Sequence, residues 1–220
     1  MSPRIVYEQE LSQLKHSVRE MNERAEISYD KLILAASENK REQLEELLTV
    51  DREFLDMQRR IEAMCLTLLT RQQPVATDLR IVSAALKVVT DIERIGDHVT
   101  DMAELFVRLD PPYSAGREPL LHAMMEEAKE MVHDAAVAFV EGDMELAQKV
   151  ISRDDVVDDY FNKVKDAMMV GIREKTMGAD QIVDILMLAK YVEKIADHAV
   201  NISEWAVFQK TGNMQDTRLL

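Results

Sequence analysis

The chain has 220 residues, 47% of them hydrophobic and 5% aromatic, with six Gly, five Pro and a formal net charge of −14. The apolar share excludes a wholly disordered chain, and the few Gly and Pro residues disfavour an all-β sandwich or barrel, which needs many turns. The 41 acidic against 27 basic side chains argue against nucleic acid as a partner, because clustered cations are what bind a duplex.

The first part of the chain is typical of long helices. Between Pro3 and Pro74 there is neither Gly nor another Pro, so no residue there breaks a helix. We predict one helix over about 5–37 and, after a tight turn, a second over about 41–70. The second ends before Pro74, because the residue preceding a proline avoids the helical region. A third helix, capped by Thr or Asp, is predicted over about 77–109.

The second part of the chain repeats this plan. Residues 111–119 (PPYSAGREP) hold three of the five prolines and mark a linker. Beyond them we predict helices over about 118–141, 144–175 and 181–210. The predicted organisation is a first three-helix unit at 1–110, a linker at 111–117, a second three-helix unit at 118–210 and a polar tail at 211–220.

The two units also match in sequence, with an offset of 100 residues. Residues 92–98 (IERIGDH) parallel residues 192–198 (VEKIADH), and Glu104 parallels Glu204. A duplicated helical unit explains this match, and short connections make consecutive helices antiparallel. The sequence therefore predicts an all-α fold of two tandem three-helix bundles, with six helices in total.

Each repeated segment lies on a helix whose acidic side chains share one stripe. At about 100° per residue, four oxygen-bearing side chains fall within roughly 80° of arc, and apolar residues lie opposite. We expect little neutralisation within either stripe, and like charges four residues apart repel by a few tenths of a kcal/mol. The stripes are Glu93, Asp97, Asp101 and Glu104 on the third helix, and Glu193, Asp197, Asn201 and Glu204 on the sixth.

The middle helix of each unit adds acids at the border of its apolar face. These are Asp154 and Asp158 in the second unit and Asp51 in the first, where Leu55 stands in place of a second acid. Two interpretations stay open: an acidic face that keeps the bundle solvated, or a site for a cation. Oxygen ligands without thiols favour Mg, Ca, Mn or iron, with zinc less natural.

Three further residues bear on the class of protein. His98 and His198 follow the second acid of each motif, a position more typical of packing residues than of metal ligands. The single cysteine, Cys65, excludes an internal disulfide and a thiolate-rich zinc site. The N-terminal residues lack the apolar core of a signal peptide, and no apolar run approaches the roughly 18 residues that span a bilayer. We therefore expect a cytoplasmic protein.

Residues 71–80 (RQQPVATDLR), followed by 92–98 and 192–198, resemble the PhoU family of phosphate-signalling proteins, and the match covers essentially the whole chain. The resemblance implies two three-helix bundles related by pseudo-twofold symmetry, with multinuclear metal clusters on paired acidic motifs. Carried over to this chain, the ligands are Glu93, Asp97, Asp101 and Asp51 in the first repeat, and Glu193, Asp197, Asn201, Asp154 and Asp158 in the second.

The resemblance also implies a function. Members are accessory proteins that negatively regulate the phosphate regulon and phosphate uptake, linking the ATPase of the phosphate ABC transporter to a sensor histidine kinase. They are not regarded as enzymes. We expect Fe, Mn, Mg or Zn as the ion, a homodimer as the assembly, and contact with the membrane only through the transporter. The alternatives are a metal-dependent phosphohydrolase, in which clustered carboxylates and ions activate water, and a purely structural helical module.

Overall fold

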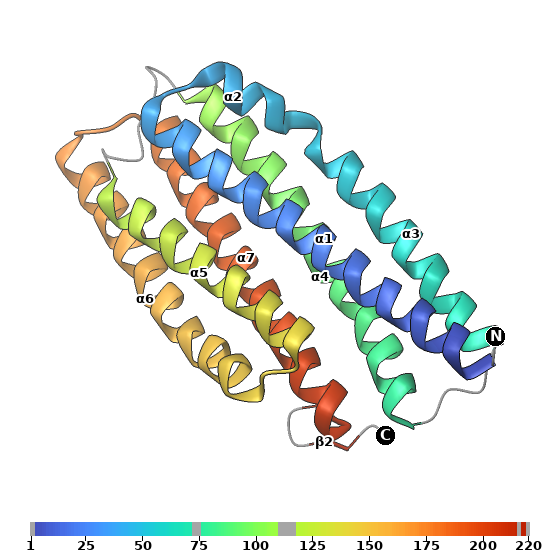
Figure 1. Ribbon diagram of the computed structural model, residues 1–220. Helices are drawn as coiled ribbons and strands as arrows, with labels where there is room; N and C mark the ends of the chain where they lie inside the picture. The colour runs from blue at the N-terminus through green and yellow to red at the C-terminus, as the bar shows by residue number, and fades with distance from the viewer. Residues whose placement is uncertain (1–2, 72–75, 110–117, 215–216, 219–220) are drawn as a thin grey trace.

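Six long helices, joined mostly by short turns, make up almost all of the protein (Figure 1). The computed structural model describes residues 3–71, 76–109, 118–214 and 217–218. The predicted linker at 111–117 lies outside the described residues, as does most of the predicted break at 71–74.

The helices follow one another in the predicted order, three in each half of the chain, and the all-α prediction is confirmed. Their ends agree with the sequence prediction within a few residues, except in the second predicted helix. The helices are α1 (Pro3–Glu38), α3 (Val50–Arg71) and α4 (Ala76–Arg108) in the first half, and α5 (Pro119–Glu141), α6 (Met144–Glu174) and α7 (Ala179–Thr211) in the second.

The second predicted helix is interrupted near its start. In place of one helix over 41–70 the chain forms α2 (Arg41–Glu45), a 3₁₀ segment η1 (Glu46–Thr49) and then α3. A 3₁₀ turn winds more tightly and changes which backbone groups are paired. Here the Leu47 carbonyl accepts a buried hydrogen bond from the Thr100 hydroxyl of α4 at 3.2 Å. This tertiary bond has no signature in the local sequence, which explains why the interruption was not predicted.

The turn between α5 and α6 shows how the chain reverses. Gly142 has φ 69°, a left-handed conformation that glycine adopts without a Cβ penalty. The Asp143 carboxylate then accepts hydrogen bonds from the backbone N–H groups of Glu145 and Leu146, at 3.0 Å each. This N-cap satisfies two of the free donors at the start of α6. Consecutive helices therefore run antiparallel, as predicted.

Four helices form the centre of the molecule and two lie on its flanks (Figure 1). Helix α3 packs against α1 and α4 in the first half, and α6 packs against α5 and α7 in the second. The halves meet along α1 with α5 and along α4 with α7, and one continuous hydrophobic core runs through both. Cys65 is fully buried in that core, as expected. Among the described helices, none is long and apolar enough to cross a bilayer.

Within each half, equivalent positions on the outer and inner helix pair in the same way, as expected of a duplicated unit. In the first half, the Gln58 amide of α3 donates to the Thr90 hydroxyl of α4 at 3.3 Å. At the corresponding positions of the second half, the Lys190 ammonium of α7 lies 5.4 Å from the centre of the Phe161 ring of α6. The residue types differ while the pairing of positions is kept.

The end of the chain, within the predicted polar tail, forms a short hairpin. Helix α7 stops at Gly212, whose φ is 77°, and the chain turns back on itself. Strand β1 (Asn213–Met214) pairs antiparallel with β2 (Thr217–Arg218). This short hairpin follows the helix because a left-handed glycine at the helix end reverses the backbone.

Candidate functional site

In the second half, four predicted ligands lie on one side of the α6–α7 pair. They are Asp154 and Asp158 of α6 and Glu193 and Asp197 of α7, and we call them the α6–α7 acidic group. Burial raises the pKa of Asp154, and the charges of Asp197 and Asp158 raise it further. Burial likewise raises the pKa of Asp158, with the charges of Glu193 and Asp197 adding to it. The charged forms of Asp154 and Asp158 are therefore destabilised by burial and by neighbouring carboxylates, and a nearby cation would relieve the second effect.

The first half has a matching but smaller group, formed by Asp51 of α3 with Glu93 and Asp97 of α4, which we call the α3–α4 acidic group. Glu93 is 8% exposed, and its pKa is raised by burial and by the charge of Asp97. The pKa of Asp97 is raised by burial, and the charge of Asp51 contributes. Leu55 is partly exposed beside them, where the second half has an acid, so this group has one carboxylate fewer.

Both groups carry basic side chains of their own, contrary to the expectation of little neutralisation. Arg94 donates to Asp97 at 3.0 Å, and in the second half Lys190 and Lys194 pair with the acids three residues further along α7. A spacing of three residues brings side chains together on a helix surface. No such pair with Asp154 or Asp158 of α6 occurs among the described residues, so neither acid is in direct contact with a basic side chain there.

The donor chemistry of these groups fits a hard cation, but their side chains are not gathered around a point. Carboxylates are the ligands that Mg, Ca and Mn prefer, and they also serve iron. Within the described parts of the chain, however, no three His, Cys, Asp or Glu side chains are arranged to hold an ion. The helices bring the members of each acidic group onto one face without converging their oxygens.

Two predicted ligands, Asp101 and Asn201, lie at the contact between α4 and α7. The Asn201 amide donates to an Asp91 carboxylate oxygen at 3.1 Å, and the same oxygen lies 2.8 Å from Nδ1 of His198. On the other side of the pseudo-twofold axis, burial raises the pKa of Tyr191, and the charge and hydrogen bond of Asp101 add to it. Asp91 and Tyr191 occupy equivalent positions of the two halves, as do Asp101 and Asn201. The Asp91–Asn201 contact is therefore equivalent to the Tyr191–Asp101 contact.

The two repeated histidines meet at the same axis. The ring centres of His98 and His198 are 5.6 Å apart, and His98 lies 5.4 Å from the ring of Tyr191. Burial lowers the pKa of His98, and the charge of His198 lowers it further. Asp91 and Tyr191 were not among the predicted site residues, because they occupy equivalent positions of the repeat but differ in residue type.

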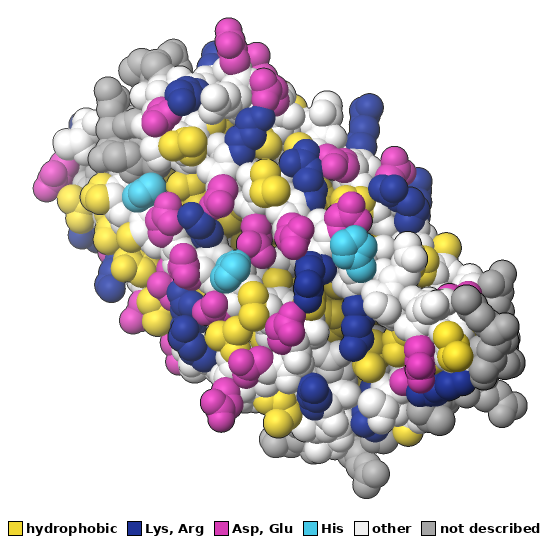
Figure 2. Space-filling model, viewed as in Figure 1, with side chains coloured by type: hydrophobic (Ala, Val, Ile, Leu, Met, Phe, Trp, Pro, Cys, Tyr) yellow, Lys and Arg dark blue, Asp and Glu magenta, His cyan; other side chains and the backbone are white. Residues whose placement is uncertain are grey.

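A separate contact joins the halves along α1 and α5. Figure 2 shows acidic and basic side chains intermixed on the face where these two helices lie. Behind them, Oδ1 of Asn22 and the hydroxyl of Tyr29 are buried without a hydrogen-bond partner among the described residues. We call this contact the α1–α5 seam. Its ion pairs are Arg19 with Glu141 (2.8 Å), His133 with Glu26 (2.9 Å) and Lys129 with Asp30 (2.9 Å).

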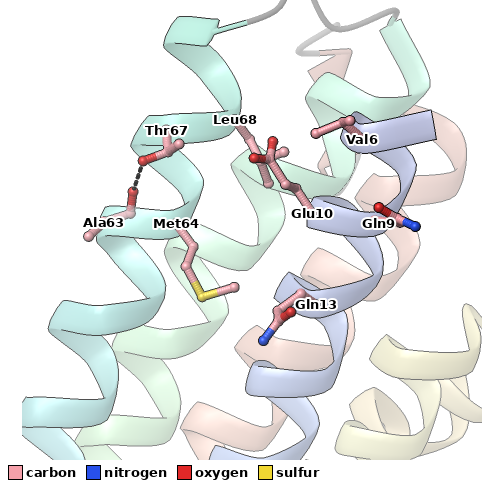
Figure 3. A pocket seen from close by; sticks show the side chains of 8 residues that line it. All are labelled: Val6, Gln9, Glu10, Gln13, Ala63, Met64, Thr67 and Leu68. Atoms are coloured by element: carbon pink, nitrogen blue, oxygen red, sulfur yellow. Dashed lines mark hydrogen bonds between the residues drawn. The ribbon is translucent and has the colours of Figure 1, made fainter. Parts of the chain in front are cut away.

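A groove of about 570 Å³ lies away from both acidic groups, between the start of α1 and the end of α3 (Figure 3). In Figure 3, Gln13 and Met64 point toward one another across it. Among the described residues that line it, none is Lys or Arg, the side chains that hold a transferring phosphoryl group. The groove therefore gives no support to a phosphohydrolase. Its lining is Val6, Gln9, Glu10, Gln13, Ala63, Met64, Thr67 and Leu68.

Comparison with known proteins gives consistent matches over most of the chain. A family model described as the PhoU domain matches residues 18–106 and 121–206. A phosphate-specific transport system accessory protein PhoU homolog of Clostridium acetobutylicum is 31% identical over 216 residues, covering 97% of this chain and 98% of that protein. The homolog of Aquifex aeolicus is 31% identical, covering 93% of each.

Solved structures agree with the sequence matches. The crystal structure of the phosphate transport system regulatory protein PhoU from Streptococcus pneumoniae superposes with a TM-score of 0.88 at 26% identity, covering 96% of this chain and 100% of that one. The crystal structure of PhoU from Pseudomonas aeruginosa gives a TM-score of 0.87 at 25% identity, covering 94% and 100%.

Proposed function

Because the chain belongs to the PhoU family, whose members are accessory and regulatory proteins rather than enzymes, we propose that it is a regulatory adaptor of phosphate homeostasis. It negatively regulates the phosphate regulon and phosphate uptake by coupling the ATPase of the phosphate ABC transporter to a sensor histidine kinase. In this proposal it acts in the cytoplasm as a homodimer and reaches the membrane only through the transporter. The observation that supports a metal-dependent form of this role is the presence of equivalent acidic groups on the two halves.

The proposed ion sites are the two acidic groups. Asp154, Asp158, Glu193 and Asp197 would hold ions in the second half, and the α3–α4 acidic group would do so in the first. The pKa values of Asp154 and Asp158, raised by burial and then by neighbouring carboxylates, support this assignment, because a divalent cation relieves the repulsion between the carboxylates.

Asp101 and Asn201 also belong to the proposed ligand set, but they differ from the other ligands in already having a hydrogen-bond partner on the other half. Each already bonds to a side chain across the α4–α7 contact, so each would exchange that bond for an ion. We therefore expect the remaining carboxylates to contribute more to the affinity for metal than these two.

A bound ion would supply charge compensation and would tie neighbouring helices together at a fixed angle. A partner that binds one helix arrangement better than another would then sense whether the site is filled. Such a switch requires a difference in partner affinity between the two states, which is what defines coupling between sites.

The test uses the double variant Asp97→Ala with Asp197→Ala, purified without chelator. We expect its metal content by elemental analysis to fall and its affinity for the ATPase or the kinase to change. Asp166→Ala is the matched control, because this exposed acid lies on α6 outside the acidic group. Loss of metal with unchanged affinity for both partners would refute the switch, and metal-stimulated phosphatase turnover lost on Glu193→Ala would refute the adaptor.

A further inference from the structure

The face that carries the α6–α7 acidic group continues into exposed apolar side chains toward the α6–α7 turn. Met169 and Ile172 on α6 are 47% and 57% exposed, and Val183 and Met187 on α7 are 57% and 41% exposed. We call these four residues the apolar end. The α6–α7 turn lies at the end of the molecule opposite the C-terminus (Figure 1).

Helix geometry places the apolar end and the acidic group on one continuous surface. At about 100° per residue, Val183 and Met187 fall within roughly 80° of Asp197 around α7. On α6, Ile172 likewise falls within roughly 80° of Asp158 around the helix axis. On each helix, apolar and acidic side chains therefore share one stripe and are separated along the helix axis rather than around it.

The contact between Lys190 and Phe161 shows that the two stripes face one another. These residues lie midway along the surface, and the ammonium is 5.4 Å from the ring centre. Because α6 and α7 are antiparallel neighbours, their acidic residues lie at one end of the surface and their apolar residues at the other. From Ile172 to Asp158 the surface is about 21 Å long, at 1.5 Å per residue, which is the length of a helix of about four turns.

The fold does not require the whole apolar end, since the first half lacks two of its four residues, both on α4. Ser83 and Lys87 stand on α4 at the positions of Val183 and Met187. Of the matching residues on α3, Leu66 is 57% exposed. The same architecture thus forms with polar residues on α4, and exposed apolar side chains in one place mark an interaction site.

We propose that the apolar end and the α6–α7 acidic group together form a docking surface for an amphipathic helix of a partner protein. Its apolar side chains, spaced three and four residues apart, pack on the apolar end. In the metal-free protein its Lys or Arg side chains lie over Asp154 and Asp158 of α6, which have no ion pair within the described residues, so the charges are complementary. The inference rests on the proposed function, from which it takes the transporter ATPase and the sensor kinase as partners.

The test exchanges the apolar residues for those of the first half. The variant Val183→Ser with Met187→Lys is measured for binding to the purified ATPase and to the cytoplasmic part of the kinase, with EDTA in the buffer. We expect at least a tenfold higher Kd for one partner and an unchanged thermal unfolding curve. The control is Ile27→Ser with Leu34→Lys, which removes equally exposed apolar side chains from α1, and its Kd should equal that of the wild type.

The charged end has its own readout. Asp158→Asn should reduce the slope of log Kd against log salt for the same partner, because one attractive carboxylate is lost. An unchanged Kd in the exchange variant, or an equal loss in the control, overturns the inference. Wild-type binding only when Mn²⁺ replaces EDTA also overturns it while leaving the proposed function intact. Binding of neither partner under either condition contradicts the proposed function itself.

Discussion

The contact between Gly96 of α4 and Phe54 of α3 leaves no room for a side chain at position 96. A Cβ atom built on Gly96 would lie 2.2 Å from Cδ2, 2.5 Å from Cγ and 2.8 Å from Cε2 of the Phe54 ring. The ring is fully buried, so it has no free space into which to turn. In the second half the corresponding residues are Ala196 and Val157, a larger residue on one helix facing a smaller one on the other.

The variant Gly96→Ala tests this complementarity. Alanine favours a helix by about 1 kcal/mol over glycine, whereas overpacking a core costs roughly 1–3 kcal/mol or more. Because all three contacts are far inside van der Waals distance, we expect the overlap to dominate, with a net loss of about 2 kcal/mol. For a chain of this size that is a fall of roughly 4–8 °C in Tm.

A double-mutant cycle isolates the cause. Phe54→Val alone leaves a cavity and should lose about 2 kcal/mol, given that Phe→Ala costs 3–5 kcal/mol. The double variant recreates the pairing of the second half and should lose only about 1 kcal/mol, so the two single losses are not additive. Urea unfolding followed by circular dichroism measures all four proteins. If Gly96→Ala is as stable as the wild type, or if the losses simply add, the packing argument is refuted.

Three further outcomes follow from the described contacts. Asp91→Ala removes the acceptor shared by an imidazole and an amide of α7, so urea unfolding should show a loss of about 1–3 kcal/mol, and an unchanged midpoint would contradict this. The hydrogen bond to Glu26 raises the pKa of His133, so its stabilising effect is complete below the unfolded value of about 6.5 and is lost as the pH rises through the higher folded value. His133→Gln should therefore flatten that part of the stability curve, and an identical slope in both proteins would refute the link. Burial raises the pKa of the Cys65 thiol to about 12, so a thiol reagent should label it only upon unfolding, and prompt labelling of the native protein would disprove its burial.

The helices were predictable because they depend on local properties of the sequence. The lack of Gly and Pro over the first seventy residues and the 100-residue offset gave six helices in the right order. The 3₁₀ segment was missed because its cause is tertiary: the Thr100 hydroxyl bonds to the Leu47 carbonyl from a helix fifty residues away. A local pattern cannot contain that information.

The acidic faces were partly predictable for the same reason. Helical periodicity placed Glu93 with Asp97. It also placed Arg94 and Lys194 three residues from the acids that they neutralise, and the expectation of little neutralisation was wrong. The partners that meet across α4 and α7 were not predictable, because Asp91 acquires its role only when the two halves dock.

The residues at the α4–α7 axis make the two halves complementary rather than interchangeable. Two copies of the first half about the same axis would set Asp91 against Asp101 twice, crowding four carboxylates around two imidazoles. Two copies of the second half would set Tyr191 against Asn201 twice and leave both histidines without an acid. Each half therefore supplies side chains that the other lacks at this contact. The two halves are related to one another as the subunits of a heterodimer are, and two copies of either half would not reproduce the contact.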